Sequence, residues 1–377
     1  MPSRMRAEIA EQPEALRRTF GALLPQAGEL EALGRATRQV LFIARGSSDN
    51  AAVYGQYLCS ARAGRLASLA SPSLATVYRA DLDLRGVLAV AVSQSGATEE
   101  IVTTLEWARR CGARTVAVTN VANSPLAEYA DVPLITQAGE ELAVPATKTY
   151  TTQLAAMAVL AHALHRPGTA SEGARGAPGG AGGTEGGGVG TPWRGSAGGG
   201  VAVEELLGVP EAVGAMLGVA DAAEELAERL VEVDALVVSG RGFAYSTALE
   251  LALKLKETCY LTAVGLSYAD LLHGPIAVVD RRTPVLLVAA GNGPMIPEMT
   301  GLARRIAGTG ADVHGIGGDR EFAAACRSTL PGTSLPEHLA PFALAVPGQL
   351  LAEALARARG LDPDAPRGLD KVTQTDA

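Results

Sequence analysis

The first half of the chain alternates short apolar runs with amphipathic stretches. Continuous apolar runs at Val40–Ala44, Gly86–Ser93 and Thr115–Asn120 predict buried strands. Helical patterns lie between them, notably at Thr98–Cys111, and another runs from Thr147 to about His165. Such alternation of strands and helices predicts a parallel sheet that is covered by helices.

The second half repeats this pattern. Ala235–Gly240 and Pro284–Ala290 read as strands, with a long helix from about Tyr245 to Leu261 and a final amphipathic helix from about Leu339 to Gly360. In both halves a strand is followed by glycine and a helix, in the sequences ARGSSDNA and SGRGFAYS, which indicates a diverged internal duplication. We therefore predict an α/β chain with two units of similar size.

A glycine-rich segment separates the two halves. Residues 167–200 read PGTASEGARGAPGGAGGTEGGGVGTPWRGSAGGG, which offers too little apolar surface to offset the entropy of ordering it. We interpret this segment as a flexible linker. The expected organisation is a first domain over residues 1–166, a linker over 167–200 and a second domain over 201–377.

Composition and charge narrow the function classes. The chain has 377 residues, of which 47% are hydrophobic but only 4% aromatic, so its core must consist mainly of Ala, Val and Leu. A formal net charge of -8 does not provide the basic face that nucleic-acid binding needs, and it disfavours an anionic membrane surface. A phosphate group would have to be bound by local backbone N–H groups and hydroxyls.

The chain is expected to be cytoplasmic. Its first twenty residues are charged and lack the apolar run of a signal peptide. No stretch reads as long and apolar enough to span a bilayer, and the best candidate, Leu154–Leu164, reads as a buried helix. The four cysteines are scattered without a C-x-x-C pair, which fits a reducing compartment and disfavours a zinc site.

The most informative segment is SQSGATEE, from Ser93 to Glu100. It follows a predicted strand and opens a helix, so its hydroxyls and free backbone N–H groups favour an anion. Gly96 lets the backbone turn and approach a ligand closely. An ordinary helix N-cap is the alternative, but a cap needs only one hydroxyl. The residues GSS at 46–48 also follow a strand and would face the same crevice.

The segments SQSGATEE and GSSDNA resemble the sugar-isomerase (SIS) domain family. Three further segments resemble the isomerase half of glucosamine-6-phosphate synthase: EELAVPATKTYTTQ from Glu140, LALKLKETCYLTAVGLSYADLLHGP from Leu251 and DPDAPRGLDKVTQT from Asp362. The resemblance covers nearly the whole chain outside the glycine-rich segment. It implies two tandem SIS domains, each a parallel sheet flanked by helices in a flavodoxin-like three-layer sandwich.

The resemblance also implies roles for single residues. Phosphate and nearby sugar hydroxyls would be bound by Ser48, Ser93, Gln94, Ser95 and Thr98, with backbone contact from Val144 and with Lys254 lining the same site. Glu257 would be the base that moves a proton between C1 and C2. His273 would assist ring opening, in this family often across the interface of a homodimer. Lys371 would approach the carbonyl carbon as an imine former or a ring-opening aid. No metal or other cofactor is implied.

The residues alone leave plainer readings open. Glu250 and Lys254, four positions apart on one predicted helix, could form a surface ion pair that Glu257 extends. Isomerisation does need a carboxylate to transfer the proton and a group that acts on the carbonyl. Compared with the synthase pattern, this chain has Val264, Leu272 and Ala146 where that pattern has glutamate, lysine and serine. These departures leave the substrate open.

The resemblance favours one reaction. No glutaminase sequence precedes the isomerase-like sequence, and the KVTQT tail and LLHGP loop look more like stand-alone SIS-type deaminases. We therefore expect conversion of glucosamine 6-phosphate to fructose 6-phosphate and ammonia. The alternatives are a glutaminase-less synthase-like protein, a galactosamine-6-phosphate deaminase or isomerase, a fructosamine-phosphate deglycase, and a non-catalytic sugar-phosphate sensor. The expected partners are a small sugar phosphate and a second copy of the chain, not nucleic acid or membrane.

Overall fold

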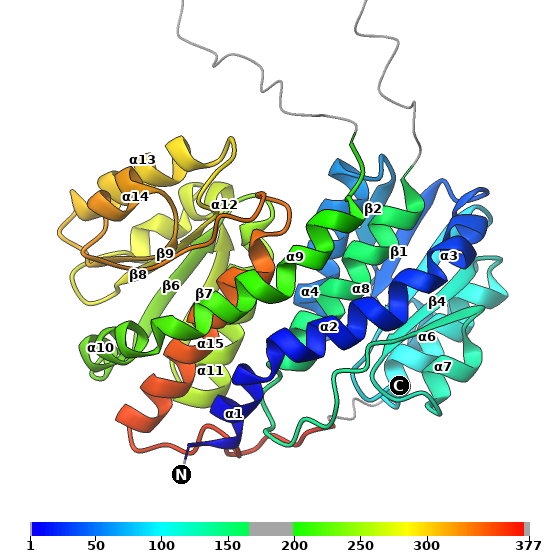
Figure 1. Ribbon diagram of the computed structural model, residues 1–377, viewed down its shortest axis with the longest axis horizontal. Coiled ribbons are helices and arrows are strands. Elements are labelled where there is room, and N and C mark those ends of the chain that lie inside the picture. The colour runs from blue at the N-terminus through cyan, green and yellow to red at the C-terminus, as the bar shows by residue number, and fades with distance from the viewer. Residues whose placement is uncertain (1, 166–198, 373–377) are drawn as a thin grey trace, which may run out of the picture.

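The computed structural model describes residues 2–165 and 199–372, which form two α/β units side by side (Figure 1). Each unit contains a five-stranded sheet whose strands all run parallel. The sheet of the first unit has the order β2-β1-β3-β4-β5, and that of the second has the order β10-β9-β8-β6-β7. The two orders correspond strand for strand, as expected of a duplication, and helices flank both sheets. The predicted fold class is therefore confirmed.

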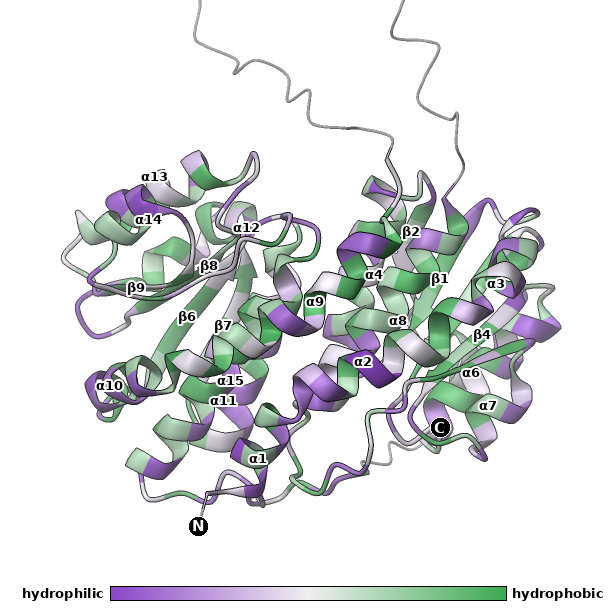
Figure 2. Ribbon diagram, viewed as in Figure 1, coloured by the Kyte–Doolittle hydropathy of each residue, from purple (hydrophilic) through white to green (hydrophobic). Residues whose placement is uncertain are grey.

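The strands are short and apolar (Figure 2). Their bounds are β1 Gln39–Ile43, β2 Leu66–Leu69, β3 Val87–Val92, β4 Arg114–Thr119, β5 Val132–Ile135, β6 Ala235–Gly240, β7 Thr262–Ser267, β8 Val285–Ala289, β9 Val313–Gly317 and β10 Ser328–Leu330. The central strands β3, β4, β6 and β8 are buried along almost their whole length. Strands that are covered on both faces are apolar throughout, which is why their runs stand out in the sequence.

Helices make up most of the remaining structure. They are α1 Arg4–Ala10, α2 Gln12–Leu23, α3 Ala27–Gly34, α4 Ser47–Ala61, α5 Ser73–Thr76, α6 Glu99–Arg110, α7 Pro125–Tyr129, α8 Lys148–Leu164, α9 Val203–Met216, α10 Ala220–Leu230, α11 Ala244–Cys259, α12 Tyr268–Leu272, α13 Ile296–Ala307, α14 Arg320–Ala325 and α15 Ala340–Ala358. Short 3-10 turns occur at η1 Leu24–Gln26, η3 Leu217–Val219 and η4 Pro275–Val278.

The elements predicted from the sequence are confirmed, with bounds that differ by two residues at most. The strand expected at Ala235–Gly240 is β6, and the helix expected after Thr147 is α8. The edge strands β2, β5, β7 and β10 and the buried strand β9 were not predicted. Several residues of the edge strands are exposed, and β9 contains a histidine and two glycines, so these segments do not stand out as apolar runs. The proposed linker lies almost wholly outside the described residues, so the division into domains stays a prediction.

One hydrophobic core runs through both units. Phe342 of α15 lies between two aromatic rings of the first unit, with ring centroids 6.3 Å from Phe20 and 5.8 Å from Tyr54. Tyr54 also contacts Phe243 at the start of α11, at 6.4 Å between centroids. Helices from both halves of the chain thus pack together, and their contact fixes the second sheet relative to the first.

The expectation that no stretch is long and apolar enough to span a bilayer is not met by the helical run Val203–Leu230. It comprises α9, η3 and α10, and it is long and apolar enough to cross a membrane by length and composition only. Its buried side, which includes Leu206, Val213 and Leu226, belongs to the shared core. A helix of a buried core can be equally long and apolar, because length and composition do not depend on where the apolar residues point.

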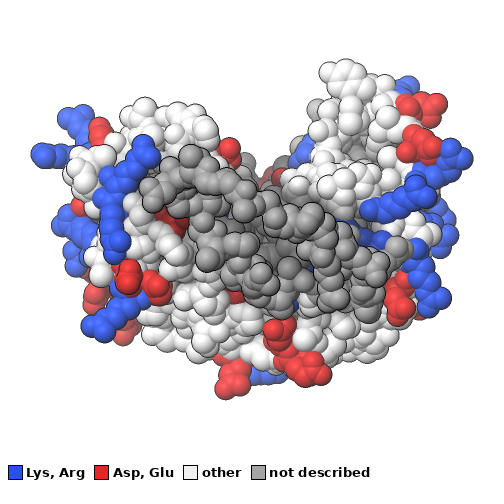
Figure 3. Space-filling view, turned by 90° about the horizontal axis from the view of Figure 1, so that it is seen from above, with Lys and Arg blue, Asp and Glu red and all other residues white. Residues whose placement is uncertain are grey.

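Charged side chains of both signs lie interspersed on the face shown in Figure 3. Lys and Arg gather on the outer flanks of both units, with Asp and Glu among them. Among the residues drawn in colour, neither positive nor negative charge dominates this face.

Candidate active site

The site begins where the adjacent parallel strands β1 and β3 end. Because β1 and β3 pair in register from Gln39 and Val87 onward, the loops that follow them lie next to each other. The first loop leads into α4 through Gly46, whose φ of 59° is in the left-handed region. The second loop is the segment from Ser93 to Thr98 that leads into α6. The two loops form one polar crevice.

The second loop is shaped by its own hydroxyls. The N–H of Gly96 donates to Ser93 Oγ at 3.2 Å, and the Ser93 and Thr98 hydroxyls lie 3.4 Å apart. Gly96 has a φ of 62°, and a Cβ at this position would lie 2.2 Å from Ser124 Oγ, so only glycine fits. Thr98 is the N-cap residue of α6, yet its side chain makes no capping hydrogen bond. The plain N-cap interpretation of this segment is therefore wrong, and the Thr98 hydroxyl can serve another group.

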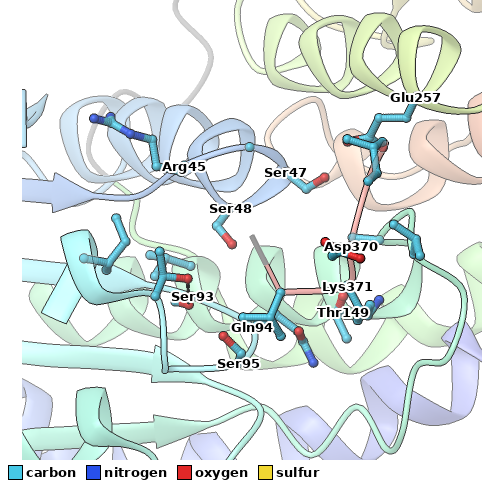
Figure 4. A pocket seen from close by; sticks show the side chains of 18 of the residues that line it. Arg45, Ser47, Ser48, Ser93, Gln94, Ser95, Thr149, Glu257, Asp370 and Lys371 are labelled. Atoms are coloured by element: carbon cyan, nitrogen blue, oxygen red, sulfur yellow. Dashed lines mark hydrogen bonds between the residues drawn. The ribbon is translucent and has the colours of Figure 1, made fainter. Parts of the chain in front are cut away.

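A cavity of about 310 Å³ opens above these loops (Figure 4). Its size is within the range of about 300–1,000 Å³ that is usual for small-molecule sites. Its wall comes from both units and from the C-terminal tail. The lining residues with polar or charged side chains are Arg45, Ser47, Ser48, Ser93, Gln94, Ser95, Thr98, Thr149, Lys254, Glu257, Asp370 and Lys371, and Val144 also lines it.

The cavity brings together nine of the ten residues predicted for the site. Ser48, Ser93, Gln94, Ser95 and Thr98 line the crevice end, whereas Val144, Lys254, Glu257 and Lys371 line the remaining wall. The tenth, His273, is exposed at the C-cap of α12 and does not line the cavity in this chain.

The helix α11 contributes a row of three charged side chains. Lys254 Nζ lies 2.5 Å from Glu257 Oε2 and 3.5 Å from Glu250 Oε1. The Lys254 and Glu250 side chains are 1% and 2% exposed, whereas that of Glu257 is 21% exposed and reaches the cavity. The surface ion pair that the sequence left open is therefore wrong, because the pair is buried where the two units meet.

Burial and charge act in opposite directions on this row. Burial alone would lower the pKa of Lys254, but the carboxylates of Glu257 and Glu250 outweigh it and hold that pKa above its ordinary value. Burial raises the pKa of Glu250, and the nearby Lys254 opposes this. Glu250 also accepts hydrogen bonds from Ser47 Oγ at 2.9 Å and Asn50 Nδ2 at 2.8 Å. Lys254 is therefore a fixed ammonium that orients the Glu257 carboxylate.

The tail lysine is held by a second buried carboxylate. Lys371 Nζ donates to Glu141 Oε2 and to the carbonyl oxygen of Ala143, each at 2.7 Å. Glu141 also accepts bonds from the backbone N–H and hydroxyl groups of Thr147 and Thr149. Burial would raise the pKa of Glu141, but Lys371 and these hydrogen bonds outweigh it and lower that pKa. Glu141 thus remains ionised and fixes the Lys371 ammonium at the cavity wall.

An ion pair lies at the outer end of the crevice. Arg45 donates two bonds to Glu100, with Nε 3.0 Å from Oε2 and Nη2 2.9 Å from Oε1. Glu100 is in the first turn of α6, the helix whose N-terminus faces the crevice. The guanidinium points away from Ser48 in Figure 4. Arg45 therefore neutralises a carboxylate that would otherwise repel an anion bound at the crevice.

Sequence reasoning missed the supporting residues. Glu141, Asn50 and Thr149 act through hydrogen bonds to partners far along the chain, and Arg45 acts through Glu100. One signal was available, because Glu141 lies within the segment that carries the family resemblance. In the described part of the chain, no group of three His, Cys, Asp or Glu side chains could hold a metal ion.

Comparison with known proteins identifies the family. A model described as the SIS domain matches residues 35–163 and 229–299, together more than half of the chain. The chain belongs to the SIS domain family. The first match covers β1 to β5 with the crevice, and the second covers β6 to β8 with α11. The family resemblance read from the sequence is therefore confirmed.

Relatives of this SIS protein include sugar-phosphate enzymes. It is 33% identical over 377 residues to glutamine–fructose-6-phosphate aminotransferase (isomerizing) of Thermococcus kodakarensis, covering 98% of this chain but 58% of that protein. The C-terminal domain of glucosamine-fructose-6-phosphate aminotransferase from Francisella tularensis superposes with a TM-score of 0.80 at 25% identity, covering 97% and 99% of the two chains. Glucosamine-6-phosphate deaminase from Thermotoga maritima shares the fold, with a TM-score of 0.74 at 23% identity over 99% and 100%. The chain thus spans just over half the length of the curated relative.

Proposed function

We propose that this SIS protein is a cytoplasmic glucosamine-6-phosphate deaminase that converts glucosamine 6-phosphate to fructose 6-phosphate and ammonia. The observation that carries the proposal is the position of Glu257. Its carboxylate reaches a cavity whose other end is a crevice lined by hydroxyl groups, and Lys254 orients it. A base at one end and an anion site at the other suit a phosphorylated sugar with a reacting C1–C2 unit.

In this reaction the crevice would bind the 6-phosphate. Ser48, Ser93, Gln94, Ser95 and Thr98 would donate to its oxygens, together with backbone N–H groups at the start of α6. The helix dipole favours negative charge at this end. Because the phosphate does not react, it would hold the sugar in one orientation and leave C1 and C2 near Glu257 and Lys371.

The chemical step would be a proton transfer. In the open-chain substrate, Glu257 would take the proton from C2 and return it to C1, while a second proton passes from the amine nitrogen to the aldehyde oxygen O1. The aldehyde and amine would thereby become a hydroxyl and a C2 imine. Water would then add to the imine carbon and expel ammonia, which leaves fructose 6-phosphate. Lys371 would act at the C1 carbonyl or at ring opening, and Val144 would contact the sugar through its backbone. His273 would assist ring opening from the neighbouring subunit of a homodimer.

A second candidate, the synthetic direction, is favoured by the aminotransferase relatives. The chain is 33% identical to the isomerizing aminotransferase of Thermococcus kodakarensis. The same base and phosphate site would serve isomerisation in either direction. Incubation with fructose 6-phosphate and ammonium salt, followed by detection of glucosamine 6-phosphate, would test this direction.

The variant Glu257→Gln tests the proposal, because it removes the base but keeps the size of the side chain. Turnover should fall by a factor on the order of 10²–10⁴, while glucosamine 6-phosphate still binds. Exchange of the C2 hydrogen in deuterated water should fall with it. Glu228→Gln, an exposed glutamate on α10, is the matched control and should retain full activity.

Two results would count against the proposal. Near-normal ammonia release by Glu257→Gln would remove Glu257 from the proton transfer. A wild-type protein that binds amino-sugar phosphates but turns over none of them would be a sensor. A panel of glucosamine, galactosamine and fructosamine phosphates would identify the sugar, since the departures at Val264, Leu272 and Ala146 leave it open.

A further inference from the structure

We infer that the first helix of the chain is part of the active-site scaffold, and that Asp364 is the positioning residue that links this helix to the tail lysine. The inference rests on the proposed function of Lys371. Asp364 lies seven residues before Lys371, in the tail that follows α15. In Figure 1 this tail passes α1 on its way to the first unit.

Asp364 joins three segments of the chain. Its carboxylate accepts the backbone N–H groups of Arg4 and Met5, each at 2.8 Å, at the start of α1. Its carbonyl oxygen accepts the N–H of Val144 at 2.9 Å. Val144 lines the cavity, so a single tail residue ties the cavity wall to the first helix.

The same helix also holds the loop that receives Lys371. Glu8 of α1 is 4% exposed, and its carboxylate accepts the N–H groups of Leu142, at 2.5 Å, and Ala143. The carbonyl oxygen of Ala143 in turn accepts from Lys371 Nζ. Glu8 therefore fixes one partner of the lysine, while Asp364 fixes the chain that carries the lysine.

The body of α1 is rigidly placed. Met5 and Ile9 are fully buried in the shared core. Asp364 accepts hydrogen bonds from backbone N–H groups of α1, and Glu8 of α1 accepts hydrogen bonds from N–H groups of the loop. These bonds therefore attach the tail and the loop to the core and not only to each other. The tail has a further attachment at Arg367, whose guanidinium lies 4.2 Å over the Tyr260 ring. Without Asp364, the residues between α15 and Lys371 would lose their link to α1.

The substitution Asp364→Ala removes both acceptors for α1. Because a misplacement of about 1 Å can cost up to about a hundredfold in rate, kcat should fall about ten- to a hundredfold. The phosphate crevice is untouched, so KM should change little. Asp364→Asn keeps one acceptor oxygen and should lose less. Asp234→Asn, whose side chain is 99% exposed, is the matched control.

A chemical readout makes the test independent of the reaction. The sequence contains four lysines, of which Lys148 and Lys254 are buried, Lys256 is exposed and Lys371 is partly exposed. Acetylation with a limiting reagent, quantified for each lysine by mass spectrometry, should proceed faster at Lys371 in Asp364→Ala than in the wild type. Lys256 serves as the internal reference and should not change.

A double variant shows whether Asp364 acts through Lys371. In a Lys371→Met background, Asp364→Ala should cause no further loss of kcat, whereas independent roles would multiply the losses. Unchanged kcat together with unchanged acetylation of Lys371 in Asp364→Ala would overturn the inference. If the wild type has no turnover, the proposed function fails, but acetylation still decides the role of Asp364. If Asp364→Ala does not fold, Asp364→Asn supplies the same two measurements.

Discussion

Lys371 Nζ lies 2.7 Å from Glu141 Oε2, across 230 residues of sequence, and this carboxylate is completely buried. A buried carboxylate is tolerated where it is paired and hydrogen-bonded, and Thr147 and Thr149 complete its bonds. The pair attaches the end of the chain to the first unit. The pair stabilises only its immediate surroundings, but it holds the Lys371 side chain in one position at the cavity.

Glu141→Gln should loosen this attachment. The neutral amide accepts a weaker bond from the Lys371 ammonium, so we expect kcat to fall about ten- to a hundredfold, with a smaller change in KM. Glu140→Gln changes an exposed neighbouring glutamate and should behave like the wild type. Equal kinetics of Glu140→Gln and Glu141→Gln would show that Lys371 needs no fixed partner.

The same substitution should change the pH dependence of stability. Because the folded-state pKa of Glu141 lies below its ordinary value of 4.5, its ionised form stabilises the fold above that pH. This stabilisation is lost as pH falls through the lowered pKa. The difference in Tm between wild type and Glu141→Gln should therefore be largest near pH 7 and shrink well below pH 4.5. Thermal melts at several pH values measure it, and a difference that does not vary with pH would contradict the assignment.

Ser95→Ala should act mainly on binding. A hydrogen bond to a charged group contributes about 1.5–3 kcal/mol, so KM for the sugar phosphate should rise about tenfold or more. The contact persists through the reaction, so kcat should change little. Thr98→Val should behave in the same way, and the exposed Ser60→Ala is the control. A collapse of kcat at constant KM would mean that Ser95 does not bind the phosphate.

Arg45 and Glu100 should compensate for each other. Arg45→Ala leaves the carboxylate of Glu100 without this cation at the crevice, so KM for a phosphorylated substrate should rise. Adding Glu100→Gln removes the repelling charge and should recover most of the lost affinity. Isothermal titration of the three variants with inorganic phosphate measures this without turnover. If the double variant binds no better than Arg45→Ala, Arg45 contacts the phosphate itself.

His273 should be required from a neighbouring subunit, because it is exposed and does not line the cavity of its own chain. Mixing inactive His273→Ala chains with inactive Glu257→Ala chains should restore part of the activity after subunit exchange. Exchange is verified by tagging one variant and copurifying the other. A verified mixed dimer without activity would assign both residues to one subunit's site or remove His273 from the reaction.

Glu337 should make stability depend on pH near neutrality. Its carboxyl group is packed against Gly293, where a Cβ would lie 2.6 Å from Oε2, and burial raises the pKa of Glu337 from 4.5 to about 7. The folded chain therefore holds this proton more tightly than the unfolded chain, and the stabilisation present below pH 4.5 is lost as pH rises to about 7. Glu337→Gln mimics the protonated form, so its Tm should exceed that of the wild type at pH 8 and match it at pH 4. A lower Tm at pH 8 would show that the carboxylate has a stabilising partner.

The sequence determined the features that depend on neighbouring residues. Strands such as β3 and β6 are covered on both faces, so their apolar runs predict them directly, and the segment Ser93–Thr98 carries its hydroxyls and glycine in one stretch. The order of these segments, together with the family resemblance, identified nine residues that the cavity brings together. The local sequence pattern was sufficient to predict these features, because the polar side chains and the backbone turn that presents them lie within a few residues of each other.

Only the tertiary structure decided the partners of those residues. The sequence could not distinguish a surface pair of Glu250 and Lys254 from the buried row on α11, because burial there depends on α4 of the other unit. Likewise, Glu141 and Lys371, or Asp364 and the start of α1, meet only after both halves of the chain have packed around one core. Such contacts depend on the relative placement of elements hundreds of residues apart, and that placement is set by side-chain packing across the whole core rather than by any local periodicity.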